Sequence, residues 1–488
     1  MVVNSLNFLL FFVVVFVVYY LPISKNTPKF QNTWLLLTSY FFYGFADWKM
    51  IPLLFGATVV YYVIGLWLKM EMEKGKTKVA SNITTLGVVL GVGVLLYFKY
   101  LNFFAESFFQ LLNGIGLYVS WTTLNIVLPI GISFFTFKLI SYVIEIHREH
   151  IQPSSDFIEF GVYVAFFPTI LSGPIDRPNK FIPQLKAKRS FNYDMAFDGS
   201  RQILWGMFTK MCIADNLAIA TDSIWSDFSS QNGSTLLLMA LLYPIQMYAD
   251  FDGYSNMAIG VGKILGINVA KNFNHPFLAR NIAEYWRNWH ISLTGWLTDY
   301  VFSPLNIAFR NLNNLGIIFA ILVNFVLIGL WHGANWTFAI FGLYHGLLYI
   351  PLILSGSFGK KKKLRPNHYG LPNRKDFLKM IGTYCMVSIG LIIFRATTIL
   401  DAISYSKGII SDSIIRIPYL GGSSVYIGFL FAIYILIAEW RDREKDFPLQ
   451  QKVGSHGFIN LRLSDFIIVT LIVLFGNIDS KQFIYFQF

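Results

Sequence analysis

Residues 315–345 read LGIIFAILVNFVLIGLWHGANWTFAIFGLYH, an almost unbroken apolar stretch with a histidine, His332, near its middle. A helix needs about 20 apolar residues to cross the hydrocarbon core of a bilayer. This stretch is long enough for one such helix and the start of a second. Because similar apolar runs recur along most of the chain, the sequence predicts an all-α protein embedded in a lipid bilayer.

The composition of the whole chain supports this class. Of the 488 residues, 55% are hydrophobic and 17% aromatic, and only 14% are charged. Soluble domains carry roughly 25% charged residues, so the composition excludes an ordinary soluble globular protein. The two cysteines, Cys212 and Cys385, are too few for a disulfide framework or a cysteine-built metal site.

Apolar segments recur as candidate spans. They lie near residues 6–22, 33–47, 50–69, 83–100, 103–119, 124–144, 157–171, 200–220, 235–262, 315–331, 334–354, 377–395, 423–440 and 465–478. Because polar motifs interrupt some of them, we expect about eleven transmembrane helices plus several re-entrant or interfacial helices. We predict one polytopic membrane domain, residues 1–488, with its functional motifs at 241–346 and a basic cytoplasmic loop at about 355–379.

The formal net charge of +12 arises from 39 basic and 27 acidic residues. The basic residues gather in short loops between apolar segments, in the clusters Lys74, Lys76 and Lys78; Arg177, Lys180, Lys186, Lys188 and Arg189; Lys360–Lys363, Arg365, Arg374 and Lys375; and Arg441, Arg443 and Lys445. Such loops mark the cytoplasmic side of a membrane protein, and placing those at Lys25 and Lys74 there puts the N-terminus outside. The same charge attracts an anionic donor such as coenzyme A, so both interpretations stay open. Nucleic-acid binding is not indicated.

His332 lies at a depth in the apolar stretch where an ionisable side chain is costly. One interpretation is a neutral histidine that hydrogen-bonds to another helix, and the other is a role in proton transfer or ion passage. A buried neutral imidazole accepts a proton from a hydroxyl group. The setting therefore favours a general base.

Residues 281–304 read NIAEYWRNWHISLTGWLTDYVFSP, an amphipathic segment rather than a spanning one. On one continuous helix Glu284, Arg287 and His290, spaced three apart, share a face. The segment is either an interfacial helix anchored by its tryptophans or a helix that re-enters the protein and lines a path to His332.

Two acidic residues, Asp250 and Asp252, interrupt the hydrophobic run at 241–266. Residues two apart on a helix do not face each other, so we expect separate backbone or arginine partners rather than a proton-sharing pair. The remaining histidines do not have the spacing of metal ligands, and we predict no metal site.

Several segments carry a resemblance that covers nearly the whole chain in order and spacing. They are FFYGFADW (41–48), YFKYLNFF (97–104), LPIGISFFTF (128–137), FFPTILSGPIDRP (166–178), YADFDGYSNMAIG (248–260), NFNHPFLARNIAEYWRNWHISLTGWLTDY (272–300), GLWHGANW (329–336), IIFRA (392–396) and FIYFQF (483–488). Together they resemble the membrane-bound O-acyltransferase family, and within it the bacterial branch typified by the membrane subunit of alginate O-acetyltransferase.

The resemblance implies a fold of many helices around a central pore, with a donor reached from the cytoplasm and an acyl group delivered to the outer side. It implies that His332 is the buried catalytic histidine and that His290 is the second one. The supporting residues that it implies are Asp250, Arg287, Trp331 and Asn335.

Some positions depart from the pattern of this branch. They are Asn288, Thr298, Pro304 to Asn306, and the pair Asp252 and Asn256, which looks like an exchange on one helix face. These departures leave the acceptor open among alginate, cellulose, peptidoglycan and other polysaccharides.

The resulting hypothesis is a multi-pass acetyltransferase of the bacterial inner membrane that binds no resident cofactor. It moves an acetyl group from acetyl-CoA towards hydroxyl groups of an extracytoplasmic polysaccharide, with help from an extracytoplasmic acetyltransferase partner. Two alternatives are an acyltransferase that takes its group from a carrier protein, as in D-alanyl transfer to teichoic acid, and a proton-coupled transporter that uses His332 as a relay.

Overall fold

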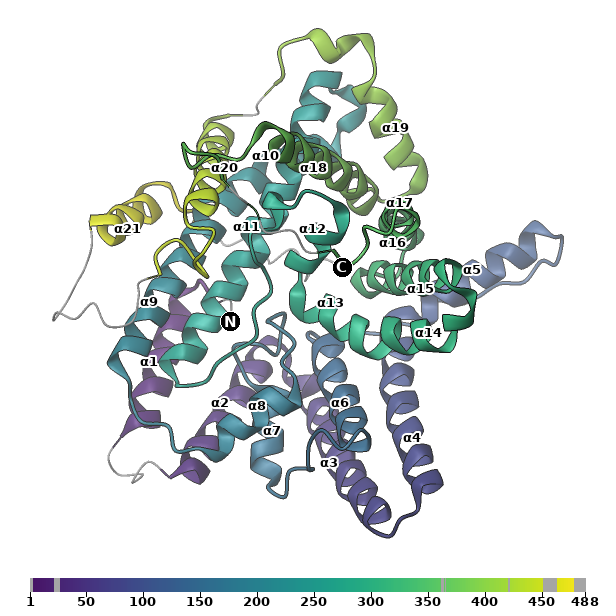
Figure 1. Ribbon diagram of the computed structural model, residues 1–488, viewed down its shortest axis with the longest axis vertical. Coiled ribbons are helices and arrows are strands. Elements are labelled where there is room, and N and C mark those ends of the chain that lie inside the picture. The colour runs from purple at the N-terminus through teal and green to yellow at the C-terminus, as the bar shows by residue number, and fades with distance from the viewer. Residues whose placement is uncertain are drawn as a thin grey trace. The chain divides into compact units, whose positions relative to one another are not determined.

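The computed structural model describes residues 3–21, 27–360, 364, 366–419, 422–450 and 463–477, and within these ranges its regular elements are helices (Figure 1). The chain forms two compact units: Met1–Gly199 with Val261–Ala270, and Ser200–Gly260 with Lys271–Phe488. The prediction of an all-α protein is confirmed. That residues 1–488 act as a single acyltransferase domain stays a prediction.

The first unit is built mainly of long apolar helices joined by short turns. Its helices are α1 (Leu6–Tyr20), α2 (Pro28–Asp47), the 3-10 turn η2 (Trp48–Met50), α3 (Ile51–Glu73), α4 (Thr77–Leu95), the π-helix η3 (Leu96–Tyr100), α5 (Leu101–Gly114), α6 (Ile132–His147), α7 (Phe157–Ala165), α8 (Pro178–Lys186) and the start of α9 (Tyr193–Phe208).

The second unit continues from α9 and holds the motifs singled out in the sequence. Its helices are the π-helix η4 (Thr209–Ala214), α10 (Asp215–Ser226), η5 (Phe228–Ser230), α11 (Gly233–Ile264, whose last turn belongs to the first unit), η6 (Pro276–Leu278), α12 (Ile282–Asn288), α13 (Ile291–Leu297), the π-helix η7 (Thr298–Phe302), α14 (Ser303–Ala308), η8 (Arg310–Leu312), α15 (Asn314–His332), α16 (Trp336–Leu347), α17 (Ile350–Leu354), α18 (Arg374–Arg395), α19 (Ile399–Ile409), η9 (Asp412–Ile415), α20 (Ser423–Arg441) and α21 (Leu463–Phe475).

In the first unit, α3, α4 and α6 pack side by side (Figure 1). Small residues on α4 allow the close approach: a methyl group added at Gly91 would lie 2.7 Å from Ile140 of α6, and one at Gly87 would lie 3.2 Å from Val143. Packing through small residues is typical of helices in membranes, where apolar surface alone does not drive helices together.

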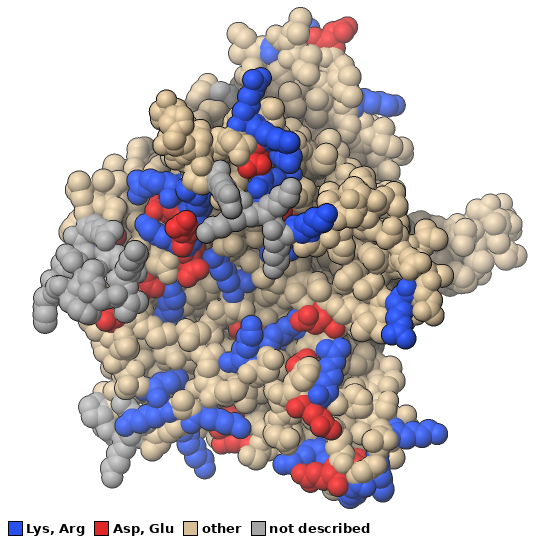
Figure 2. Space-filling view, in the orientation of Figure 1, with Lys and Arg blue, Asp and Glu red and all other residues tan. Residues whose placement is uncertain are grey.

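Large apolar side chains cover much of the outer surface of these helices. On α5, Phe104, Phe108 and Leu111 are 44%, 56% and 64% exposed. The visible side of α5 in Figure 2 carries neither basic nor acidic side chains. Surface of this kind is expected where lipid, rather than water, surrounds a helix.

Six helical segments among the described residues are long and apolar enough to cross a membrane. They are Pro28–Glu73, Thr77–Gly114, Tyr193–Ser226, Asn314–His332, Trp336–Leu354 and Arg374–Arg395. The first has 46 residues, which is enough for two passes of about 20 residues each. The segments agree with a multi-pass membrane protein, and they do not establish the expected number of about eleven transmembrane helices.

Three of the expected boundaries are wrong. The segment 124–144 is not helical until α6 begins at Ile132. The segment 157–171 holds only α7, whose nine residues are too few to cross a bilayer. α18 begins at Arg374, inside the expected loop 355–379.

α6 supplies a hydrogen-bond donor to α7 and to the irregular buried chain that follows it. The Lys138 ammonium donates to the backbone oxygen of Tyr163 at 3.2 Å and to Thr169 Oγ1 at 3.0 Å. Non-helical backbone at membrane depth is tolerated only where such partners exist, and hydropathy alone does not reveal them. Several sequence features lie outside the described residues, namely residue 22, Lys25, Lys361–Lys363, Arg365, residue 478 and the segment 483–488.

Candidate active site

His332 is the last residue of α15, where this helix packs against α16 (Figure 1). The two helices approach so closely that a methyl group at Gly329 would lie 2.0 Å from the Phe338 oxygen, and one at Gly342 would lie 2.1 Å from the Phe325 oxygen. His332 itself is 5% exposed. The α15–α16 hairpin therefore holds this imidazole at a buried helix end.

The segment that carries His290 is not one helix. α12 ends at Asn288, Trp289 is extended, and His290 has left-handed backbone angles (φ 44°, ψ 52°) before α13 begins at Ile291. The prediction that Glu284, Arg287 and His290 share one helix face is therefore wrong for His290.

The break has a cause in a neighbouring stretch of chain. The Asn274 N–H donates to the Asn288 oxygen at 3.0 Å, and the Ile291 N–H donates to the Asn272 oxygen at 2.8 Å. The Asn272 side chain also accepts from Ser292 Oγ at 2.6 Å. These bonds replace intrahelical ones on both sides of His290, and sequence reasoning had missed Asn272.

The left-handed backbone at His290 leads to a prediction about two variants. A left-handed residue costs roughly 1–2 kcal/mol for most side chains, and asparagine tolerates this conformation better than alanine. We expect His290→Ala to be less stable than His290→Asn by about 1 kcal/mol, although both lack the imidazole. Thermal unfolding of the two purified variants checks this, and equal stability would show that the backbone angles carry no cost.

The two candidate histidines both contact one indole ring. The Trp331 ring centroid is 5.3 Å from that of His290 and 5.0 Å from that of His332. Phe251 of α11 packs edge-on against His290 at 4.6 Å. Burial lowers the pKa of His290 well below its ordinary value, and the nearby His332 lowers it further. His290 is therefore neutral at physiological pH.

Asp250, the residue before Phe251, belongs to a buried ion cluster. The Lys210 ammonium of η4 lies 2.6 Å from Asp250 Oδ1 and 2.7 Å from Asp215 Oδ1. Each of these side chains is at most 6% exposed. The cluster fixes α11 at the turn that presents Phe251 to His290. Lys210 was not predicted, although a lysine inside the apolar run 200–220 was a signal for it.

Asp252 has a different partner from Asp250, as expected from their spacing, but the partners are Asn256 and Lys210 rather than the expected backbone groups or arginines. Asn256 Nδ2 donates to Asp252 Oδ2 at 2.8 Å, and Gln202 Nε2 donates to Asn256 Oδ1 at 2.8 Å. The prediction that Asp252 and Asn256 share a helix face is therefore confirmed.

Asn335 caps a helix. Its Oδ1 accepts from the Thr337 N–H at 3.0 Å, and its Nδ2 donates to the Thr397 oxygen at 3.0 Å. These bonds tie the start of α16 to the chain that follows α18. The contacts give Asn335 a role in holding the loop after His332.

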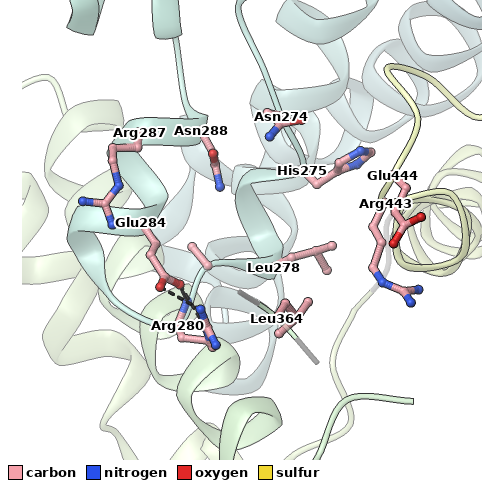
Figure 3. Close-up of a pocket in the computed structure, with 11 residues that line it drawn as sticks. Asn274, His275, Leu278, Arg280, Glu284, Arg287, Asn288, Leu364, Arg443 and Glu444 are labelled. Carbon is pink, nitrogen blue, oxygen red and sulfur yellow. Dashed lines mark hydrogen bonds and ion pairs between the residues drawn. The ribbon is translucent and has the colours of Figure 1, made fainter. Parts of the chain in front are cut away.

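A cavity of about 590 Å³ opens beside α12, and we call it the basic cavity (Figure 3). Its lining residues are Asn274, His275, Leu278, Ala279, Arg280, Glu284, Arg287, Asn288, Leu364, Arg443 and Glu444. Arg280 pairs with Glu284 at 2.9 Å, whereas Arg287 and Arg443 lie on opposite sides of the cavity in Figure 3. Burial lowers the pKa of His275, so the positive charge comes from the arginines. The lining favours an anionic ligand.

A smaller cavity of about 310 Å³ shares Arg287 with the basic cavity. Its walls are mostly apolar and include Ile321, Phe325 and Ile328 of α15. Two buried polar atoms on its lining, Trp286 Nε1 and Asn324 Oδ1, have no hydrogen-bond partner in the described part of the chain. One is a donor and the other an acceptor, which is the pair that an amide group requires.

Of the residues predicted for the site, the structure brings His290, Trp331 and His332 together directly. The residue after Asp250, Phe251, contacts His290. Arg287 lines both cavities. Asn335 lies at the end of the same loop as His332.

Comparisons with known proteins identify the family of this chain. A model of the membrane-bound O-acyltransferase family matches residues 40–366. The protein named probable alginate O-acetylase AlgI of Pseudomonas aeruginosa is 34% identical over 93% of this chain and 84% of its own length.

Two relatives with other names also match. The peptidoglycan O-acetyltransferase of Helicobacter pylori is 32% identical over 79% of this chain and 75% of its own length. The teichoic acid D-alanyltransferase of Bacillus subtilis is 32% identical over 55% of this chain and 69% of its own length. The family match and the length and identity of the first relative together show that this chain is an O-acyltransferase of the membrane-bound O-acyltransferase family, in its alginate O-acetylase-like branch.

Proposed function

We propose that this enzyme transfers an acetyl group from acetyl-CoA in the cytoplasm to hydroxyl groups of a polysaccharide outside the bacterial inner membrane. The observation that carries the proposal is the meeting of two buried histidines, His290 and His332, on the ring of Trp331. Acyl transfer needs a base for the hydroxyl and a polar group for the carbonyl, and two neighbouring imidazoles supply both.

In the proposed step, His332 accepts the proton of the acceptor hydroxyl while the hydroxyl oxygen attacks the thioester carbonyl carbon. A carbon–oxygen bond forms, the carbon–sulfur bond breaks, and the proton passes to the departing thiolate. His290, with a proton on one ring nitrogen, hydrogen-bonds to the carbonyl oxygen as negative charge develops there. The products are an ester and free coenzyme A, so no other reactant is consumed.

The two cavities support a donor of this kind. Coenzyme A carries phosphates, for which the guanidinium groups of the basic cavity are suited. It also carries a flexible arm with two amides, for which the side chains of Trp286 and Asn324, turned towards the smaller cavity that they line, would supply a donor and an acceptor. Because Arg287 lines both cavities, one extended molecule can lie along them.

A second candidate donor is a carrier protein that bears the same phosphorylated arm. The match to a teichoic acid D-alanyltransferase favours considering it. A carrier would present one phosphate at the basic cavity and would leave the nucleotide part of that cavity unfilled. The alternative of a proton-coupled transporter predicts substrate flux without covalent transfer, and the family match favours transfer.

The acceptor is proposed only as a polysaccharide hydroxyl. The named relatives act on different polymers, alginate and peptidoglycan. An extracytoplasmic acetyltransferase protein is proposed to relay the acetyl group, because the acceptor polymer lies beyond the membrane.

The proposal is tested with purified protein in detergent, given acetyl-CoA labelled in its acetyl group and oligosaccharides of alginate, cellulose or peptidoglycan. We expect release of free coenzyme A, and labelled ester on at least one acceptor once the extracytoplasmic partner protein is added. If label moves only from an acetylated carrier protein, the donor is the carrier protein rather than acetyl-CoA. If no label moves from either donor while cells lacking the protein keep their acetyl esters, the proposed function is wrong.

The basic cavity gives a prediction about donor affinity. Removing one charge-assisted hydrogen bond to phosphate costs roughly 1.5–3 kcal/mol, about 10- to 100-fold in binding. We therefore expect Arg287→Gln and Arg443→Gln each to raise KM for acetyl-CoA by about 10-fold or more with little change in kcat. Arg416→Gln, on the exposed chain after η9, is the matched control and should leave KM unchanged. An unchanged KM in both cavity variants would show that the phosphates of acetyl-CoA do not bind in this cavity.

A further inference from the structure

The inner end of the candidate active site is a wall of three phenylalanine rings. Phe338 and Phe341 come from α16 and Phe394 comes from α18. The Phe394 centroid lies 4.9 Å from that of Phe338 and 5.1 Å from that of Phe341, and all three side chains are more than nine-tenths buried. His332 contacts this wall directly, with its centroid 5.0 Å from Phe394 and 6.2 Å from Phe341.

The wall has little freedom to move away from His332. A methyl group added at Gly333 would lie 2.2 Å from the Phe338 ring, so this ring already fills the space beside the loop after α15. The close backbone contact between Gly329 and Phe338 fixes α16 against α15. Displacing these rings therefore means separating packed helices, and close-packed interiors resist even one extra methylene.

The direction in which the donor arm arrives follows from α15. Asn324, Ile328 and His332 follow one another at four-residue steps and share a helix face. The first two line the smaller cavity, and His332 comes one turn beyond them. An arm that enters along this face brings its thioester to His332, and the acyl chain beyond the carbonyl then points at the phenylalanine wall.

We infer that Phe338, Phe341 and Phe394 set the acyl length and restrict the donor to a two-carbon group. The inference rests on the proposed function and deepens it. An acetyl group ends at its methyl carbon, so among acyl groups it needs little room in front of the rings. A butyryl group adds two methylenes that meet them. In a close-fitting apolar pocket one methylene changes kcat/KM by roughly 10- to 200-fold.

The test measures kcat/KM for acetyl-, butyryl- and hexanoyl-CoA with the purified full chain and an oligosaccharide acceptor. For the unaltered protein we expect acetyl to exceed butyryl by roughly 10-fold or more. Phe394→Ala should raise the butyryl-to-acetyl ratio by roughly 10-fold or more, because it opens the wall next to His332. Phe338→Leu, a smaller change, should move the ratio in the same direction and serves if Phe394→Ala does not fold.

Phe431→Ala is the matched control, because Phe431 packs against Phe208 and Phe475 rather than against His332. It should leave the ratio unchanged. An unaltered protein that uses butyryl as well as acetyl would overturn the inference, as would an unchanged ratio in both folded wall variants. Absence of any acyl transfer by the unaltered protein, together with unchanged acetyl esters in cells that lack it, is a different result, because it contradicts the proposed function before any variant is compared.

Discussion

His332→Gln is expected to lower acetyl transfer by about 10²- to 10⁴-fold while the protein stays folded, because the variant lacks the proposed general base. Glutamine has a similar size and is neutral, so the packing of the buried site changes little. The expected loss is in kcat, with the KM for acetyl-CoA nearly unchanged, since the donor contacts lie in the two cavities. Initial rates of coenzyme A release at several acetyl-CoA concentrations measure both constants.

A second buried histidine provides the control for this experiment. His345 of α16 is 1% exposed and packs against Phe341 and Trp286, and it has no role in the proposed transfer. His345→Gln should keep most of the activity if it folds. Full activity in His332→Gln would refute its assignment as the base. Equal losses in both variants would mean that any buried imidazole in this region is needed for packing.

Lys210→Met is expected to destabilise the second unit by about 3–5 kcal/mol, because it leaves two buried carboxylates, Asp215 and Asp250, without their shared cation. The triple variant that also carries Asp215→Asn and Asp250→Asn should recover much of this loss, since neutral amides need no counter-charge. Unfolding of the purified variants in detergent, followed by helical circular dichroism, measures the differences.

The matched control is Lys263→Met. Lys263 pairs with Asp198 at 2.6 Å, but both side chains are partly exposed, at 17% and 24%. Removing such a pair costs at most about 1 kcal/mol. If Lys210→Met proves as stable as this control, the cluster does not hold α11 in place. A large loss that the triple variant does not recover would instead point to packing of the lysine stem.

The cluster also links stability to the site. Asp250 precedes Phe251, whose ring contacts His290 at 4.6 Å. A folded variant of Lys210 should therefore show reduced transfer as well as reduced stability. The resemblance had implied Asp250 as a supporting residue without giving a reason, and the ion cluster gives a physical one.

Much of the fold follows from short stretches of sequence. Apolar runs of about 20 residues predict membrane helices wherever the run is continuous, as at 315–331 and 377–395, because burial of apolar surface depends on local composition. The same reasoning failed at 157–171, where α7 is short and Lys138 of another helix donates to Thr169 in the chain that follows. Hydropathy does not register partners that lie elsewhere in the sequence.

The helical membrane class, the family resemblance and the choice of His332 as the leading candidate followed from the amino-acid sequence, because they depend on composition or on motifs that are each local. Only the tertiary structure decided the left-handed turn at His290, the pairing of Lys210 with Asp250 and the phenylalanine wall around His332. Asn272 breaks the helix from outside it, Lys210 comes from a different helix than its partner, and Phe394 is 62 residues beyond His332. Contacts between segments far apart in the chain form only when the helices pack, and no local pattern encodes them.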